Sequence, residues 1–553
     1  MTTRRIIEII FFEFFFGVCM SNFFKFLGYL KTRRFLYFIL FFLSLALCWL
    51  DPTNVFFTTF FSVFLLLRLI FCIRNRIIRN SLVIFVSLIT FLTYFIYQKY
   101  GGLSTSMVMS TFGVGLSVSL GTVQTFGLKF LVGFLFILFV ISLLSIKIPK
   151  ACYSIKERVV LTVCLILILS KPVFDGISFW GAKFFINNLE YSPTFISQPY
   201  IDQYKIFFGP LISSVSIIAE NIVDDVKYKK IDHEEYPDYI KNKTAGSTNI
   251  IYVIGESSNP GRYGIYGYGK DTTPNLSQMD RDGKICVVNN VHSPAAQTRL
   301  AVPMLVSFET PLQRGNLFKY KNLIEMAELQ GYHTYWFDSQ MQNNMWNKPF
   351  GYLAKYAEVL QTPEENNTRF PINEGQDEKL LPAIKHYFKE SQERNFYVIH
   401  LMGNHLPYSA RRGGEDNPMV DDYDASIYNV DDTLQSIFTF ADSYLKDYKL
   451  VYVSDHGEVV GQGHGFPSSD NEMYKIPLLM NDASWCAKAE QLRNNNHYFS
   501  SDLTKLLVLE MMGYSVSDQH LRDAVKNSDF VLNEKEDAIR FSELRDVPLP
   551  QHP

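Results

Sequence analysis

Five long apolar runs before residue 180 constrain the fold of this chain more than any other feature. They lie near residues 35–50, 55–73, 81–97, 130–146 and 159–175. Each is close to the length that an α-helix needs to cross about 30 Å of hydrocarbon. Runs this close together leave no polar face to meet water, which argues against buried core helices. We therefore expect residues 1–180 to form an α-helical transmembrane domain of about five spans.

The loops between these runs predict the orientation of the domain. The loops 51–54 and 98–125 hold one basic residue, Lys99. The clusters of basic residues fall in the alternate loops: Lys31, Arg33 and Arg34, then Arg74, Arg76 and Arg79, then Lys147, Lys150, Lys156 and Arg158. Because Lys and Arg concentrate in cytoplasmic loops, we expect a cytoplasmic N-terminus. An odd number of spans then places everything after residue 180 outside.

The apolar segment 6–30 is ambiguous because it holds Glu8, Glu13 and Lys25. A sixth span here would reverse the orientation, so an interfacial or re-entrant helix is the favoured interpretation. A cleavable signal peptide is not expected, because no small-residue cleavage site follows. Residues 181–246 are first amphipathic and aromatic and then highly polar. They predict a linker with helices on the outer membrane surface.

The net charge of −3 averages two unlike parts of the chain. Residues 1–180 carry 17 Lys and Arg against 5 Asp and Glu, whereas residues 181–553 carry 35 against 50. This pattern indicates a basic membrane block joined to an acidic soluble block, and no nucleic-acid partner is expected. In the soluble block, Cys286 and Cys486 are the only cysteines. They could form one disulfide, but they do not make a disulfide framework.

From residue 247 onward, short β-rich runs alternate with helical patterns. The candidate strands are 249–254, 284–291, 332–338, 395–402 and 449–455, and the candidate helices are 319–330, 376–391 and 430–446. Strands that alternate with helices predict an α/β sandwich around a mostly parallel sheet. We therefore expect residues 247–553 to form one large domain with its own core.

Residues whose side chains can act in catalysis or bind a metal follow several of these strands. Open α/β sheets bind ligands at the carboxyl ends of their strands, so these residues are expected to meet at one edge. The residues in question are Glu256, Thr298, His405, Asp455, His456 and His464. Ser257, Ser258 and Ser293 are rival nucleophiles. Asp338, Ser339 and Gln340 end another strand and could touch substrate, whereas His292, His333 and His400 are interpreted as structural.

The combination of carboxylates, imidazoles and a threonine hydroxyl indicates a zinc site. Glu, Asp and His are common ligands of tetrahedral Zn²⁺. A free threonine hydroxyl is a poor nucleophile near neutral pH, and metal coordination lowers its pKa and positions it for attack on phosphorus. The histidines His405 and His464 could bind a second metal, contact phosphoryl oxygens or protonate a leaving alkoxide.

These residues resemble the bacterial phosphoethanolamine transferases, inner-membrane enzymes of the alkaline phosphatase/sulfatase superfamily. The resemblance covers nearly the whole chain and is most specific over 249–310 and 395–470. It rests on Glu256, YGY at 266–268, TTP at 272–274, Thr298 with Val302 and Pro303, HLMGNHLPY at 400–408, and SDHGE at 454–458.

The resemblance implies a sulfatase/alkaline-phosphatase-like catalytic domain in the periplasm. It implies that Glu256, Thr298, Asp455 and His456 bind one catalytic Zn²⁺, and it leaves a second metal open. It also implies that Thr298 takes phosphoethanolamine from phosphatidylethanolamine, with His405 and His464 on the substrate side. The acceptor would be lipopolysaccharide core, lipid A or another envelope glycan.

Two departures from the family pattern bear on the acceptor and the site. Asn259 stands where the family often has a basic residue, and Arg262 could compensate. Two soluble cysteines cannot supply the several disulfides of many lipid A-modifying members, which favours lipopolysaccharide core or other glycans. The alternatives are a lipoteichoic-acid-synthase-like glycerol phosphate transferase, a periplasmic phosphatase or sulfatase, and a transporter or sensor. Transport is disfavoured because the spans hold few ionisable residues.

Overall fold

The structure, a computed structural model, describes most of the chain from residue 232 onward and little before it. The described residues are 70, 73, 75, 77–85, 159, 232–242, 244–342, 347–365, 369–414, 416–534 and 536–547. Within the predicted spans only residues 70, 73, 81–85 and 159 are described, and the segment 6–30 and the linker up to residue 231 lie outside the described residues. Residues 77–85 are helical. None of the helices in the described ranges is long and apolar enough to cross a membrane.

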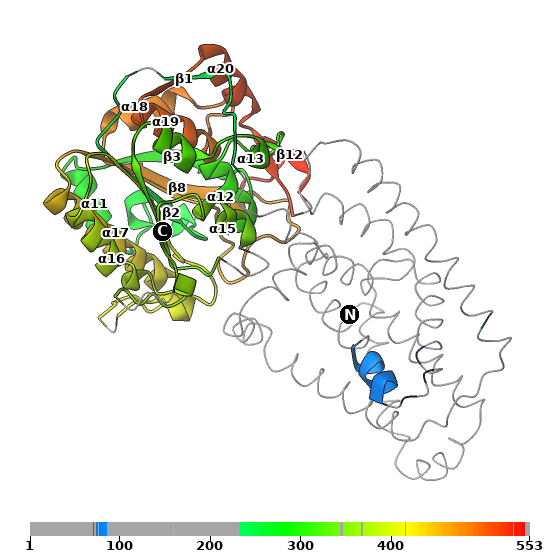
Figure 1. Cartoon of the computed structure of the whole chain (residues 1–553). Coiled ribbons are helices and arrows are strands. Elements are labelled where there is room, and N and C mark those ends of the chain that lie inside the picture. Colours follow the sequence, from blue (N-terminus) through cyan, green and yellow to red (C-terminus); the bar gives the residue numbers. More distant parts are fainter. Residues whose placement is uncertain are drawn as a thin grey trace, which may run out of the picture. The chain divides into compact units, whose positions relative to one another are not determined.

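The described residues from 232 onward form an α/β domain around an eight-stranded sheet (Figure 1). The strand β8 runs antiparallel to both its neighbours, and the other strands share one direction. The spatial order is β5 (Val359–Gln361), β4 (His333–Asp338), β6 (Asn395–His400), β2 (Asn249–Gly255), β7 (Tyr448–Ser454), β8 (Lys475–Met480), β3 (Cys286–His292) and β9 (Phe499–Ser500). The prediction of a mostly parallel sheet is confirmed, and each of the five predicted strands is present.

The central strand β2 shows why the sheet is buried on both faces. All seven of its residues are buried. Ile250, Tyr252 and Ile254 pack into one hydrophobic cluster, whereas Ile251 and Val253 pack into the other. Such continuous apolar runs are typical of parallel strands that are covered by helices on both sides.

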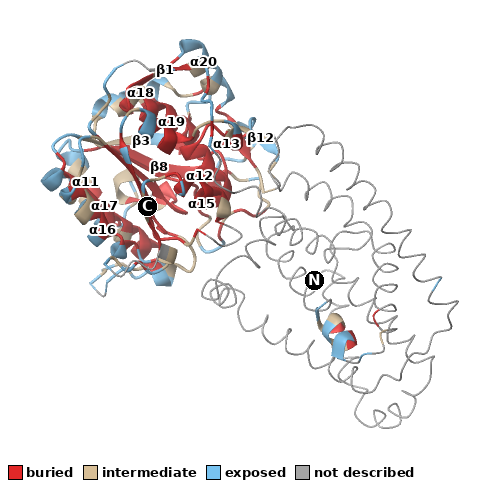
Figure 2. Cartoon of the chain, viewed as in Figure 1, coloured by how far each residue is buried: buried red, intermediate tan, exposed pale blue. Residues whose placement is uncertain are grey.

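Two layers of helices cover the sheet, and Figure 2 shows the burial concentrated where they meet it. One layer consists of α11 (Pro274–Arg281), α16 (Leu381–Lys389) and α17 (Asp422–Tyr444). The other consists of α12 (Thr298–Val306), α14 (Leu323–Leu329), α15 (Lys348–Ala354), α18 (Ala483–Gln491) and α19 (Thr504–Met511). The three predicted helices correspond to α14, α16 and α17. Of these, α17 begins well before its predicted start, because Asp421 caps its N-terminus by accepting hydrogen bonds from the amides of Tyr423 and Asp424.

Smaller elements complete the domain. Two further helices, α13 (Asn316–Lys319) and α20 (Asp518–Asn527), pack against the same hydrophobic cluster as the second layer. Two two-stranded antiparallel sheets pair β1 (Ile240–Asn242) with β10 (Tyr514–Val516), and β11 (Phe530–Leu532) with β12 (Ala538–Arg540). The first of these sheets joins the start of the described domain to a segment near its end.

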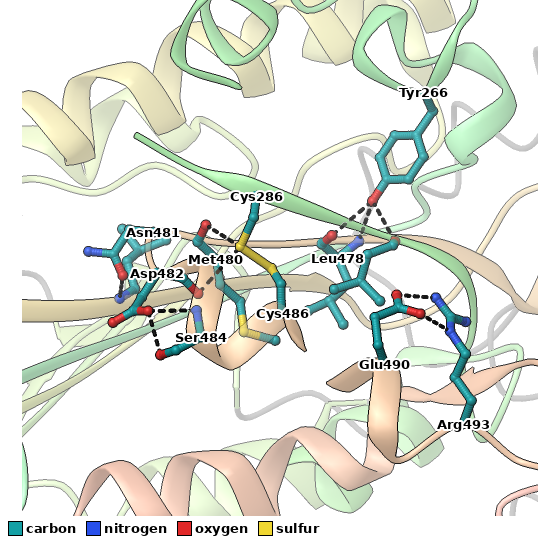
Figure 3. The surroundings of a disulfide bond; sticks show 12 residues. Tyr266, Cys286, Leu478, Met480, Asn481, Asp482, Ser484, Cys486, Glu490 and Arg493 are labelled. Atoms are coloured by element: carbon teal, nitrogen blue, oxygen red, sulfur yellow. Dashed lines mark hydrogen bonds and ion pairs between the residues drawn. A yellow bond between two sulfur atoms is a disulfide. The ribbon is translucent and has the colours of Figure 1, made fainter. Parts of the chain in front are cut away.

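One disulfide is present in the described residues, between Cys286 in β3 and Cys486 in α18 (Figure 3). It ties the sheet to a helix that covers it, and it joins positions 200 residues apart. Figure 3 also shows Tyr266, from the YGY run, beside β8. Its hydroxyl donates to the carbonyl of Leu478 and accepts from the amide of the same residue. This tyrosine therefore has a structural role.

Removing the disulfide should destabilise the domain. The double substitution Cys286→Ser and Cys486→Ser is expected to lower the free energy of unfolding by about 2–4 kcal/mol, because the unfolded chain regains the freedom of a long closed loop. Denaturant unfolding would measure this. Wild-type protein under reducing conditions should match the double variant, and equal stability of the oxidised wild type and the variant would contradict the prediction.

Candidate metal centre and active site

Four predicted site residues meet in the structure at the carboxyl edge of the sheet. Glu256 follows β2, and Asp455 and His456 follow β7; all three are fully buried. The Thr298 hydroxyl donates to Glu256 Oε2 at 2.8 Å and lies 3.2 Å from His456 Nε2. His456 Nε2 lies 3.1 Å from Glu256 Oε1 and 3.4 Å from Asp455 Oδ2. The four side chains therefore form one cluster of oxygen and nitrogen atoms.

Thr298 reaches this cluster from a strand that is not adjacent to β2 or β7. The strand β3 ends at His292, and residues 293–297 then lead to α12, of which Thr298 is the first residue. The Ser293 hydroxyl donates to the backbone carbonyl of Asp455 and so fixes this segment against the end of β7. The N-terminus of a helix carries partial positive charge, which favours an anionic reaction partner at Thr298.

The ionisable groups of the cluster shift one another strongly. Burial, together with repulsion from Glu256, raises the pKa of Asp455 to about 7. Although burial opposes ionisation of Glu256, the neighbouring His456 holds the pKa of that carboxyl well below its ordinary value. Burial likewise opposes the charge on His456, but Asp455 and Glu256 raise its pKa to about 10. Two buried carboxylates that repel each other are a site that a cation would stabilise.

The residues present fit a zinc ion. Asp455 Oδ2 is buried and accepts no hydrogen bond from the described residues. Ligand atoms of Glu256, His456 and His464 all lie within 4.8 Å of one another. Carboxylate oxygen and imidazole nitrogen are donors that Zn²⁺ prefers. His464, expected on the substrate side, thus lies close enough to the predicted ligands Glu256 and His456 to share a metal with them.

His405 and His464, the histidines expected on the substrate side, lie beside the cluster with their rings edge to face. The ring of His464 is 4.1 Å from that of His456 and 5.6 Å from that of His405, centre to centre. Burial and the adjacent His456 lower the pKa of His464 to about 3. Burial also lowers the pKa of His405, whose Nδ1 lies 2.6 Å from the carbonyl of Leu406. The Nε2 atom of His405 is therefore the ring nitrogen that can exchange a proton.

Glu458 is a site residue to which the sequence analysis gave no role. It is fully buried, its Oε2 lies 2.7 Å from His464 Nδ1, and its Oε1 accepts a hydrogen bond from the Tyr408 hydroxyl. Burial raises the pKa of Glu458 to about 8. Near neutral pH the proton of this pair therefore resides on Glu458. Its position in the run that begins at Asp455 was a signal that could have identified it.

The rival serines are placed differently from Thr298. The Ser258 hydroxyl donates to Asn404 Oδ1, and the Ser293 hydroxyl donates to backbone carbonyls. The Ser257 hydroxyl is closer to the centre, since it donates to Glu256 Oε1 at 2.6 Å and lies 3.4 Å from His464 Nδ1. Unlike Thr298, Ser257 lies in the left-handed backbone region (φ 54°). Thr298 is the hydroxyl that contacts both Glu256 and His456.

The loop after β6 is held against Glu256 by a buried carboxylate. Asp377 accepts hydrogen bonds from the amides of Met402 and Gly403 and from the Ser339 hydroxyl. Gly403 has φ 46°, and a Cβ atom there would lie 2.9 Å from the backbone oxygen of Glu256. A glycine is therefore required between β6 and His405.

The remaining candidates divide between the site and the scaffold. Gln340 donates from Nε2 to Glu256 Oε2 at 3.2 Å, which places it against the cluster. His292 stacks on Phe541, and the exposed His333 pairs with Glu358, so both have structural roles. The Arg262 guanidinium is paired with Asp424 and Tyr268. Its charge is therefore used in these contacts and not at the position of Asn259.

Comparison with known proteins agrees with this geometry. Residues 248–513 match the family model described as Sulfatase. The phosphoethanolamine transferase EptC of Escherichia coli O18:K1:H7 is 26% identical over 49% of this chain and 50% of its own length. The phosphoethanolamine transferase EptA of Helicobacter pylori is 28% identical over 42% of this chain and 47% of its own length. The chain thus spans about half the length of these curated relatives.

One solved structure matches this chain over most of its length. The integral membrane protein lipooligosaccharide phosphoethanolamine transferase A (EptA) from Neisseria meningitidis superposes with a TM-score of 0.58 at 18% identity, covering 88% of this chain and 96% of that protein. Residues 248–513 thus match the Sulfatase family model, and the curated relatives that match this chain include phosphoethanolamine transferases.

Proposed function

We propose that this chain transfers phosphoethanolamine from phosphatidylethanolamine to an envelope glycolipid, lipopolysaccharide core or lipid A, through a phosphoenzyme at Thr298. The observation that carries the proposal is the position of the Thr298 hydroxyl, 2.8 Å from Glu256 and 3.2 Å from His456 in a buried cluster of metal-ligand type. The named relatives support the phosphoethanolamine group. We further propose that residues 1–180 anchor the chain in the inner membrane, with the catalytic domain in the periplasm.

In the first half-reaction, Thr298 Oγ1 attacks the phosphorus of the donor. The new O–P bond forms as the P–O bond to diacylglycerol breaks, and the hydroxyl proton leaves along its hydrogen bond to Glu256 Oε2. Glu256, Asp455 and His456 would hold Zn²⁺ together with Thr298. A zinc ion bound there would lower the pKa of the hydroxyl and offset the charge of the two carboxylates.

The leaving diacylglycerol oxygen needs a proton, and the pair of Glu458 and His464 can supply one. His464 donates from Nε2 while its Nδ1 receives the proton of Glu458, 2.7 Å away. In the second half-reaction an acceptor hydroxyl attacks phosphorus and returns its proton to His464 Nε2, directly or by way of His405 Nε2, and His464 Nδ1 returns a proton to Glu458. Thr298 leaves and recovers its proton from Glu256, so the protons balance over the cycle.

A donor assay tests this proposal. Full-length protein in detergent is expected to release diacylglycerol from fluorescent phosphatidylethanolamine and to gain the mass of one phosphoethanolamine. Phosphatidylglycerol should react much more slowly, because the proposed transferred group is phosphoethanolamine. Preference for phosphatidylglycerol would favour the glycerol phosphate transferase instead. Hydrolysis of sulfate or phosphate esters without a lipid donor would favour a sulfatase or phosphatase.

A further inference from the structure

A buried pair of residues behind Glu256 takes no part in the reaction steps described above. Asp338 and His400 end the adjacent parallel strands β4 and β6, where they are paired in register. Both are fully buried, and His400 Nδ1 lies 3.0 Å from Asp338 Oδ2. The other ring nitrogen, Nε2, lies 3.3 Å from the side-chain nitrogen of Gln340. That nitrogen in turn donates to Glu256 Oε2.

The partners of Gln340 determine where the hydrogen atoms lie. Its Nε2 lies 3.2 Å from Glu256 Oε2 and 3.1 Å from the carbonyl oxygen of Leu401. Two acceptor oxygens at this position require the amide nitrogen there, because the amide oxygen would be repelled by both. His400 Nε2 must then face the amide with its lone pair, and the ring hydrogen must lie on Nδ1.

Asp338 enforces this arrangement. Its carboxylate accepts hydrogen bonds from Trp336 Nε1, from Gln342 Nε2 and from the backbone amide of Gln340. These donors hold the carboxylate in place, and it accepts the remaining hydrogen from His400 Nδ1. Burial favours the neutral ring, although Asp338 raises the pKa of His400. Because Gln340 Nε2 must donate to the oxygens of Glu256 and Leu401, we infer that Nε2 of His400 carries no hydrogen.

We propose that Asp338 and His400 are positioning residues that fix the side-chain orientation of Gln340 and, through it, the orientation of the Glu256 carboxylate. Partners behind a metal ligand commonly control its geometry and charge. This inference rests on the proposed function only in taking Glu256 as a metal ligand. The direction of the hydrogen bonds distinguishes this role from simple packing, because packing depends on shape alone.

Two substitutions of similar size should act in opposite ways. Asp338→Asn keeps the shape but turns one acceptor oxygen into a donor. Because Oδ2 of Asp338 accepts from Trp336, Gln342 and His400, the amide oxygen keeps that position and the new NH2 group replaces Oδ1. There it faces the backbone N–H of Gln340, which loses its acceptor and is displaced from its position against Glu256. His400→Gln keeps a donor toward Asp338 and an acceptor toward Gln340, since a carboxamide presents one of each at a similar spacing.

The test measures two quantities on the full-length protein in detergent. The first is the dissociation constant for Zn²⁺ alone, obtained by competition with a chelator. The second is kcat and KM for release of diacylglycerol from phosphatidylethanolamine. Asp338→Asn and His400→Ala are expected to weaken Zn²⁺ binding about 10–100-fold and to lower kcat with little change in KM. His400→Gln should stay within about threefold of the wild type in Zn²⁺ affinity, well inside the loss expected of the other two.

The outcomes separate this inference from the proposed function. Wild-type Zn²⁺ affinity in Asp338→Asn would overturn the inference, and so would equal losses in His400→Gln and His400→Ala. If Asp338→Asn does not fold, as judged by circular dichroism, the comparison of the two His400 variants decides. If the wild type binds Zn²⁺ but releases no diacylglycerol, the proposed function fails and the affinity comparison still stands. A wild type that binds no Zn²⁺ would overturn the inference.

Discussion

Replacing Thr298 with alanine is expected to lower transfer from phosphatidylethanolamine by at least about a thousandfold, because it removes the oxygen that forms the bond to phosphorus. The neighbouring cluster of Glu256, Asp455 and His456 does not contain a second hydroxyl in the same position. The covalent adduct should therefore disappear from the intact-mass spectrum together with diacylglycerol release. The conservative change Thr298→Ser keeps the hydroxyl and should retain measurable transfer.

Ser257→Ala is the matched control for this experiment. The Ser257 hydroxyl also donates to Glu256, but its other described neighbour is His464, whereas the other described neighbour of Thr298 is His456. Its removal is expected to reduce the rate moderately and to leave the adduct on Thr298. An adduct that survives in Thr298→Ala and is lost in Ser257→Ala would reverse the assignment of the nucleophile.

Asp455→Asn is expected to change metal affinity and metal-free stability in opposite directions. The variant loses a charged ligand, so its affinity for Zn²⁺ should fall about 100-fold or more. This loss is at or above the largest loss usually found when a residue that hydrogen-bonds to a metal ligand is replaced. In metal-free protein, however, the same carboxylate is buried beside Glu256 and is costly to ionise. The variant should therefore unfold at a higher temperature than the wild type when both are kept in chelator near pH 7.

The pH dependence of this difference follows from the raised pKa of Asp455. Its pKa in the folded protein is about 7, above its ordinary value of 3.8. The folded state thus holds this proton more tightly than the unfolded state, and the associated stability is present below pH 4 and lost as the pH rises to 7. The advantage of Asp455→Asn should grow across the same range in thermal unfolding. A constant difference from pH 4 to pH 7 would contradict it.

Local sequence patterns predicted five of the eight strands and the residues that meet in the candidate site, but not β5, β8 or β9. The strand β2 is a continuous apolar run, and such runs are buried wherever helices cover both faces. Glu256, Asp455 and His456 directly follow such strands, so strand direction alone brings them to one edge. Thr298 follows β3 after a short segment. Its position at the same edge could be predicted only if β3 was taken to run in the same direction as β2 and β7.

The contacts between distant segments were beyond such reasoning. Gln340 follows β4 and Glu256 follows β2, and the two side chains meet because only β6 lies between these strands, an order that no local pattern states. His400 was interpreted as structural because a lone histidine in an apolar strand usually is, and its Asp338 partner comes from another strand. Asp377 lies in a stretch without a motif, yet it holds the loop that carries His405. These residues act through tertiary contacts, which a sequence pattern of short range does not encode.

The antiparallel strand β8 has a consequence for how such enzymes can diversify. It stands between β7, which carries Asp455 and His456, and β3, which leads to Thr298. Neighbouring strands are about 4.8 Å apart, so the reactive hydroxyl starts about two strand widths from the ligands and is brought back by residues 293–297. The proposed nucleophile and the proposed metal ligands are thus carried by separate parts of the fold. Substitutions in 293–298 can alter the proposed attacking group while β2 and β7, which carry the proposed ligands, stay unchanged.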